Sequence, residues 1–227
     1  MFLSSRAPPV VFAGASLPEI PGTLAGRIEL LPPARRGDLG RLCARGEPGV
    51  ALLIDGVFSH ALAVTPTECR ELIEAGWTLV GAASMGALRA SELWSVGMIG
   101  VGEIYTLYRT GVLTSDGEVA VALHPDDHRE LTASIVHLRA VLQRLAEEDA
   151  MSLAEARHCL DAARGIHFLE RSWAACARAW AALGVAEQAL RRAQEYAGDR
   201  RLHPKIRDAE QALRSLLADI WVPAQPG

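Results

Sequence analysis

Short apolar runs alternate with helix-type patterns along the first half of the chain. Mostly apolar segments at 9–13, 27–31, 50–54 and 77–80 have the length and composition of buried strands. The clearest helix pattern between them covers 67–75 and is followed by a glycine that can end it. Strands that alternate with helices predict a parallel sheet with right-handed crossovers. We therefore expect an α/β fold whose parallel sheet has about four or five strands and flanking helices.

From about residue 130 onward the pattern is helical. Apolar residues recur there at intervals of three and four, which places them on one helix face. Ser152 followed by Glu155 is a capping box that predicts the start of a further helix. The pattern thus predicts two parts, an α/β core domain over 1–126 and an all-helical C-terminal region over 127–227.

The string 81–93 stands out because it joins a predicted strand to a predicted helix. Ser84 lies at this turn, where the first amides of the helix have no partner and favour an anion or a developing oxyanion. Gly86 and the neighbouring alanines leave little bulk, so a substrate could approach the backbone. The spacing is close to the Gly-x-Ser-x-Gly nucleophile elbow, whose serine is exposed, and the six-residue string around it resembles the nucleophile segment of the ClpP proteases. The alternative is that Ser84 only caps the helix.

Polar and glycine residues also follow the other predicted strands. The carboxyl ends of parallel strands meet at one edge of a sheet, where ligands bind. We therefore expect these residues to converge on one crevice with Ser84. Ser16 has an alternative role in a capping box with Glu19, and Asp38 could simply cap a helix. The residues concerned are Gly14, Ser16, Asp38, Asp55 and Gly56.

Composition narrows the possible functions. Hydrophobic residues make up 50% of the chain, charged residues 22%, and the net charge of −4 gives no indication of a nucleic-acid partner. The four cysteines show no CxxC motif, and the histidines lack metal-ligand spacing, so we expect no metal and no cofactor. We find neither a signal peptide nor an apolar run that could span a membrane, and expect a cytoplasmic protein with reduced thiols. The glycines at 97–102 do not follow a predicted strand, so we expect a tight turn there rather than a dinucleotide-binding loop.

Several of these segments together carry a likeness to a known family. They are 11–17, 32–33, 37–38, 54–58, 81–93, 97–105 and 118–121, and the Ser84 string is the most specific of them. In this order they resemble TfuA proteins over roughly residues 9–124. The helical half is similar to the variable tail of that family, most recognisably at 168–173.

Two departures from the family pattern are visible. This chain has Pro66-Thr67-Glu68 where the family often has His-Lys-Glu, so any role of that His-Lys pair has no counterpart here. It has Asp116-Gly117-Glu118-Val119 where the family often has Asp-Asp-Glu-Val. The resemblance marks Asp116 and Glu118 as candidate substrate-binding residues.

The resemblance implies a partner of YcaO enzymes, which activate a backbone amide with ATP. Together the two proteins replace an amide oxygen by sulfur in a ribosomally made peptide or in a methanogen enzyme. The TfuA partner would recruit or release the sulfur, with a thiocarboxylated sulfur-carrier protein as its donor. The expected partners are therefore a YcaO enzyme, the sulfur carrier and, indirectly, the precursor peptide.

The residues permit a specific hypothesis for this step. Ser84 would attack the thiocarboxyl carbon of the carrier, and the amides of Met85 and Gly56 would hold the oxyanion. His124 is the candidate base, and Asp55 would orient it or bind the carrier tail. Arg89 and Glu92 would contact the substrate or pair with each other. Two alternatives are a non-catalytic adaptor that docks YcaO and the carrier, and an unrelated serine esterase.

Overall fold

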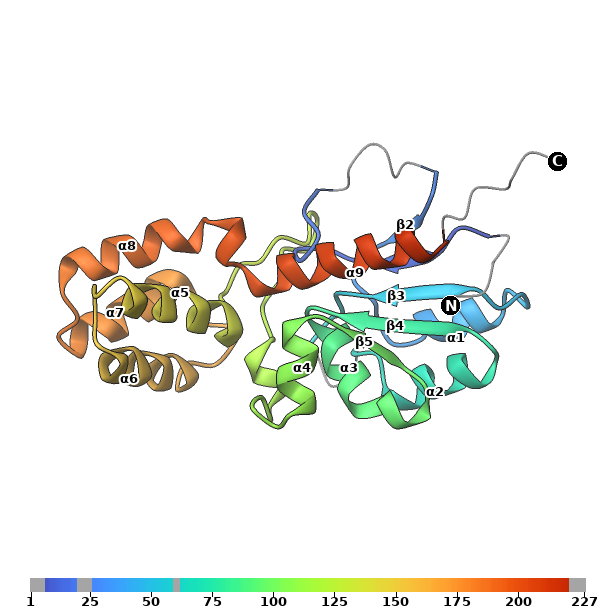
Figure 1. Ribbon diagram of the computed structural model, residues 1–227, viewed down its shortest axis with the longest axis horizontal. Helices are drawn as coiled ribbons and strands as arrows, with labels where there is room; N and C mark the ends of the chain where they lie inside the picture. The colour runs from blue at the N-terminus through green and yellow to red at the C-terminus, as the bar shows by residue number, and fades with distance from the viewer. Residues whose placement is uncertain (1–6, 20–25, 59–61, 221–227) are drawn as a thin grey trace.

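The computed structural model describes residues 7–19, 26–58 and 62–220. Within these ranges one five-stranded, fully parallel sheet has the order β2-β1-β3-β4-β5 (Figure 1). It confirms the expected parallel sheet with flanking helices and a helical C-terminal region. The strands are β1 (Val10–Phe12), β2 (Glu29–Leu31), β3 (Val50–Leu53), β4 (Thr78–Ala82) and β5 (Ile99–Val101).

Helices connect the strands and continue after the sheet. Short 3₁₀ turns are η2 (Trp94–Val96), η3 (Asp116–Glu118) and η4 (Arg200–Leu202). The helices of the α/β part are α1 (Asp38–Cys43), α2 (Pro66–Glu74), α3 (Met85–Leu93) and α4 (Glu103–Arg109). Those that follow are α5 (Ile135–Glu147), α6 (Leu153–Arg164), α7 (Trp173–Ala182), α8 (Glu187–Ala197) and α9 (Pro204–Ile220).

Local sequence explains several helix starts. Thr65 and Glu68 form a reciprocal capping box at α2, with Pro66 in the first turn, where its missing N–H costs nothing. The segment that departs from the family pattern therefore begins a helix in this chain. The predicted capping box of Ser152 and Glu155 is confirmed at the start of α6.

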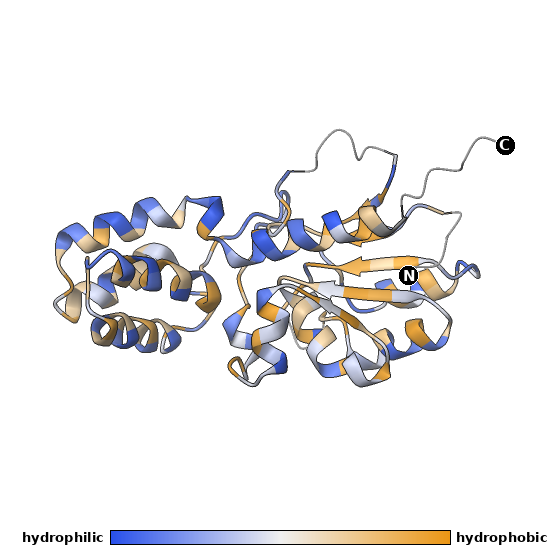
Figure 2. Cartoon of the chain, viewed as in Figure 1, coloured by the Kyte–Doolittle hydropathy of each residue, from blue (hydrophilic) through white to orange (hydrophobic). Residues whose placement is uncertain are grey.

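The sheet is covered on both faces. Helices α1, α2 and α3 pack on one face, and α9 packs on the other. Figure 2 shows the apolar strands between these layers and the polar outer surface of α9. The residues of α9 that face the sheet are Ala209, Ala212, Leu213 and Leu216.

Four of the later helices form a bundle at the other end of the molecule. Helices α5 to α8 enclose an apolar core around Trp180, whose indole N–H donates to the carbonyl of Cys159 over 2.8 Å. Figure 1 shows α9 running from this bundle across the sheet. The last helix of the C-terminal sequence thus completes the α/β layer, while a division between residues 126 and 127 stays a prediction.

Two local expectations were wrong. Residues 97–102 contain β5, a three-residue edge strand, in addition to the expected turn. Ser16 lies in a turn, because its hydroxyl donates to Asp55 instead of capping a helix through Glu19. After the sheet the chain forms a short hairpin, in which Leu123 pairs with Glu130.

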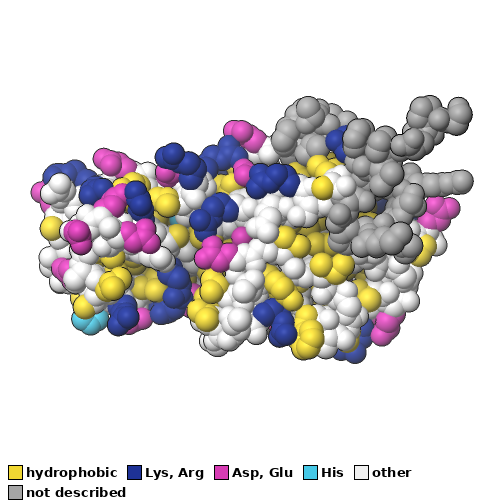
Figure 3. Space-filling view, in the orientation of Figure 1, with side chains coloured by type: hydrophobic (Ala, Val, Ile, Leu, Met, Phe, Trp, Pro, Cys, Tyr) yellow, Lys and Arg dark blue, Asp and Glu magenta, His cyan; other side chains and the backbone are white. Residues whose placement is uncertain are grey.

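Charged side chains of both signs are interspersed over the bundle and α9 on the face shown in Figure 3. Within the described ranges, no helix combines the length and the apolar character needed to cross a bilayer.

Candidate functional site

The turn between β4 and α3 has an unusual backbone. Ala83 adopts φ 64°, a left-handed conformation that costs a residue with a Cβ about 1 kcal/mol or more. Ser84 follows at φ −108° and ψ −115° and makes no side-chain cap hydrogen bond to α3. Ser84 therefore occupies the N-cap position of α3 without capping the helix through its hydroxyl, and its position on a strained strand-to-helix turn resembles that of a nucleophile.

Two amides beside Ser84 have no acceptor among the described residues. They are the N–H groups of Gly56 and Met85, the two donors expected to hold an oxyanion. These residues touch, since a Cβ built on Gly56 would lie 2.9 Å from the Cβ of Met85. Pairs of unpaired backbone donors of this kind stabilise a developing negative charge.

Burial is the main difference from the expected site. Ser84 was expected to be exposed, but only 2% of its surface is accessible. The cause is the close approach of α3 to the sheet: a Cβ on Gly86 would lie 1.7 Å from the carbonyl oxygen of Leu53. The space left by the missing side chain of Gly86 is thus filled by β3, not kept free for a substrate.

Asp55 lies at the end of the neighbouring strand. Leu53 of β3 is in register with Gly81 of β4, so Asp55 and Ser84 end adjacent strands at the same sheet edge. The Asp55 carboxylate accepts hydrogen bonds from the amides of Gly14 and Ser16, both 2.9 Å, and from the Ser16 hydroxyl at 2.6 Å. Asp55 is 4% exposed and anchors the loop after β1.

His124 does not complete a triad in this arrangement. Its Nδ1 lies 3.3 Å from the Asp127 carboxylate, and its ring is partly exposed. Among the described residues, no hydrogen bond joins His124 to Asp55 or Ser84, and the Asp55 oxygens already have three donors. The expectation that Asp55 orients His124 was therefore wrong.

The other candidate residues make local contacts. Arg89 pairs with Glu92 at 2.7 Å and donates to the carbonyl of Val64, so the expected internal pairing is confirmed. Asp38 pairs with Arg41 at the start of α1. It accepts from the Arg35 amide at 2.6 Å and lines a cavity of about 440 Å³ with these arginines.

Glu118 joins the α/β part to the bundle. Its carboxylate is buried and binds Arg139 at 3.2 Å and Arg164 at 3.0 Å. The neighbouring Asp116 is exposed. Glu118 therefore has a structural role that spacing along the chain could not reveal.

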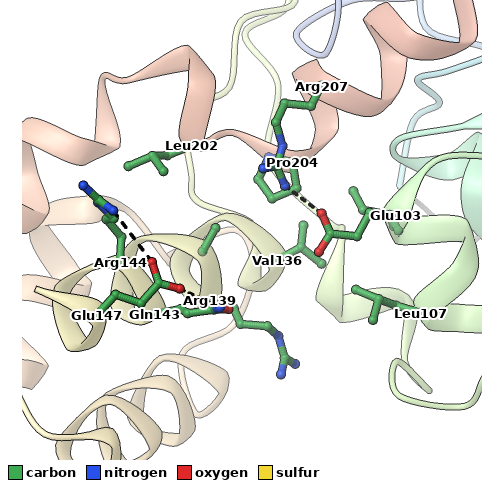
Figure 4. Close-up of a pocket in the computed structure, with 12 residues that line it drawn as sticks. Glu103, Leu107, Val136, Arg139, Gln143, Arg144, Glu147, Leu202, Pro204 and Arg207 are labelled. Carbon is green, nitrogen blue, oxygen red and sulfur yellow. Dashed lines mark hydrogen bonds and ion pairs between the residues drawn. The ribbon is translucent and has the colours of Figure 1, made fainter.

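A small cavity of about 210 Å³ lies between α4, α5 and α9, close to this junction (Figure 4). Glu103 and Arg207 point toward one another across it and pair at 2.7 Å. Arg144 pairs with Glu147 at 3.8 Å on its other side. The charges of these two pairs neutralise one another, and Arg139, which also lines the cavity, binds Glu118.

A second polar cluster was missed in the sequence. Glu130, His137 and His203 each place one potential ligand atom within 4.8 Å of the others, although no short spacing links them along the chain. Lys205, 0% exposed, donates to Glu130 Oε1 at 2.9 Å. Burial alone would raise the pKa of Glu130, but the charge of Lys205 and the hydrogen bond of His203 hold it well below its usual range.

Comparison with known proteins agrees with the family resemblance. The model of the family described as TfuA-like protein matches residues 55–172, which is more than half of the chain. The match includes Asp55, Ser84 and His124, and it extends further into the helical region than the expected 9–124. Curated proteins give no match. The chain belongs to the TfuA-like family.

Proposed function

We propose that this protein assists a YcaO enzyme in backbone thioamidation by releasing sulfide from a thiocarboxylated sulfur-carrier protein at Ser84. Membership of the TfuA-like family supports the accessory role in a YcaO-associated pathway. The observation that carries the chemical part is the strained turn at Ala83 and Ser84, beside the amides of Gly56 and Met85, which have no acceptor in the described part of the chain.

The proposed reaction balances without a cofactor. The Ser84 oxygen forms a bond to the thiocarboxyl carbon, the C–S bond breaks, and the serine proton leaves with the sulfur as hydrosulfide. Water then hydrolyses the serine ester, which returns the hydroxyl and releases the carrier as a carboxylate with one proton. The unpaired amides would stabilise the oxyanion of both steps, by roughly 3 kcal/mol for each donor.

This proposal requires that the C-terminal tail of the carrier can reach Ser84. Since the residue is 2% exposed, the carrier tail has to displace the side chains around it before attack. A thiocarboxylated C-terminus is narrow and flexible, which suits a buried site at the end of a strand. Ser84, Asp55 and the amides of Gly56 and Met85 would then form a small catalytic site at the carboxyl edge of the sheet.

The burial of Ser84 and the three hydrogen bonds on Asp55 favour a second candidate, the non-catalytic adaptor. In that role the chain holds the YcaO enzyme and the carrier near one another, and Ser84 only shapes the turn. Binding to both partners would then be retained without any hydrolysis.

One comparison separates the two candidates. Purified wild type, Ser84→Ala and Ser91→Ala are mixed with thiocarboxylated carrier, and released sulfide is measured. Ser91, on the same helix, bonds the carbonyl of Leu88 and serves as the matched control. Sulfide release lost in Ser84→Ala alone supports hydrolysis at Ser84. Release that is equal in all three proteins, with circular dichroism unchanged, leaves the adaptor role.

A further inference from the structure

Three side chains from separate parts of the chain meet beside one cavity. Glu130 ends the hairpin after the α/β core, His137 lies in α5, and His203 immediately precedes α9. One ligand atom of each lies within 4.8 Å of the others. All three line a cavity of about 590 Å³.

The histidines hold unused nitrogen atoms. His137 is 2% exposed, yet its Nε2 has no hydrogen-bond partner among the described residues, and Nδ1 of His203 is also buried without one there. Buried polar atoms are rarely left unpaired, because each loses its bonds to water on folding. The unpaired Nε2 of His137 therefore indicates a ligand from outside the described residues, and the His203 ring lies beside it with centroids 4.0 Å apart.

The spacing agrees with metal ligation. His203 Nε2 and Glu130 Oε2 are 3.4 Å apart, which is long for a good hydrogen bond. Two ligands that are each about 2.1 Å from a tetrahedral ion lie about 3.4 Å apart. A full site requires the three ligand atoms to move closer together, and the adjoining cavity gives room for that movement.

The surroundings fix the ligand side chains. Lys205 binds Oε1 of Glu130, so Oε2 keeps only the long contact to His203 among the described residues, while Trp173 meets the His137 ring edge to face with centroids 5.1 Å apart.

We propose that Glu130, His137 and His203 bind one divalent transition-metal ion, with Zn²⁺ as the best fit to two imidazoles and a carboxylate. Three protein ligands leave a fourth position, and it opens toward the cavity. Since the ion with these ligands has a net positive charge beside Lys205, the fourth ligand is a small anion. This proposal does not rest on sulfide release at Ser84, because it is tested by binding alone.

The test uses the full chain after treatment with a chelator. It is titrated with ZnCl₂ by calorimetry and with CoCl₂ by visible absorption. We expect one equivalent of zinc and the intense bands of tetrahedral Co²⁺. His137→Gln and Glu130→Gln should each weaken zinc binding by at least about tenfold. His158→Ala, which changes an exposed histidine in α6, should bind like wild type.

Lys205→Met distinguishes a cation site from an anion site. Removing this charge should tighten zinc binding if the variant keeps its circular dichroism spectrum, whereas an anion such as phosphate would bind more weakly. If Lys205→Met does not fold, the visible spectrum of the wild-type protein with Co²⁺ shows whether the site binds a cation. Absence of tetrahedral bands in the wild type, or zinc affinity that is equal in wild type and His137→Gln, would overturn the proposal.

Discussion

The carboxylate of Asp208 occupies the space that a side chain at Gly102 would need. A Cβ on Gly102 would lie 2.3 Å from Cγ of Asp208. The carboxylate accepts the first amides of α4, from Glu103 at 2.9 Å and from Ile104 at 2.8 Å. A residue of α9 therefore caps α4 and joins the two helices.

Gly102→Ala should destabilise the protein more than a positive φ alone explains. Gly102 and Gly111 both have positive φ, at 101° and 74°, but only Gly102 has a neighbour in the way. We expect Gly111→Ala to cost about 1 kcal/mol and Gly102→Ala about 3 kcal/mol or more. Urea unfolding measures both, and equal losses would show that Asp208 moves aside freely.

His137 should make stability fall with acidification. Its pKa is lowered to about 3, first by burial and then by the charge of His203. Between about pH 6.5 and the folded pKa, only the unfolded chain takes up the proton, so stability falls by up to about 1.4 kcal/mol per pH unit. Urea midpoints measured from about pH 7 to about pH 5 should fall less in His137→Gln than in wild type. Parallel slopes would contradict this assignment.

Asp208 should have the opposite effect on how stability depends on pH. Burial raises its pKa to about 6, although the two amide donors favour the charged form. The folded chain therefore binds a proton between about pH 6 and about pH 4 that the unfolded chain does not, and stability rises as pH falls through this window. Asp208→Asn removes this gain, so its urea midpoint should fall more steeply on acidification than that of wild type. A slope unchanged from wild type would show that Asp208 does not titrate there.

Gly86→Ala should disrupt the turn that holds Ser84. The added methyl group would lie 1.7 Å from the Leu53 carbonyl oxygen, so α3 has to leave β3. We expect a loss of about 3 kcal/mol or more in the free energy of unfolding. Gly40→Ala is the control, because this glycine lies inside α1 with nothing near its Cβ position. It should stabilise the protein by about 0.5–1 kcal/mol. A loss in both variants would point to a general intolerance of alanine.

Arg171→Ala should weaken the junction between the bundle and the α/β part. Arg171 is 3% exposed and donates to the carbonyl of Ala133 at 2.8 Å, and to those of Gly117 and Ala120. Loss of the guanidinium leaves buried carbonyls unpaired, which should cost about 3 kcal/mol. Thermal and urea unfolding check this, with the exposed Arg157→Ala expected within about 0.5 kcal/mol of wild type.

The sequence was sufficient to predict most of the sheet. The apolar runs around Val11, Leu52 and Val80 are long enough to be recognised as buried strands, and all three lie in the sheet. β5 was missed because its three residues include Gly100 at the edge of the sheet, where neither length nor apolar character marks a strand.

The site was less predictable because it depends on contacts distant in sequence. The elbow pattern correctly placed Ser84 at a strand-to-helix turn, but it carries no information about how closely Gly86 approaches Leu53. The cluster of Glu130, His137 and His203 forms only after α9 returns to the sheet. Short-range spacing rules cannot detect such a set.

The position of α9 has a consequence for biosynthesis. Val11, Leu52, Ile54 and Val80 rest against this helix, yet residues 204–220 leave the ribosome after every strand has been made. Until then an apolar sheet surface stays open to water on the nascent chain, and chaperones have a binding site there. This face of the sheet can therefore be covered only after residues 204–220 have been synthesised, so the order of synthesis delays completion of the α/β layer.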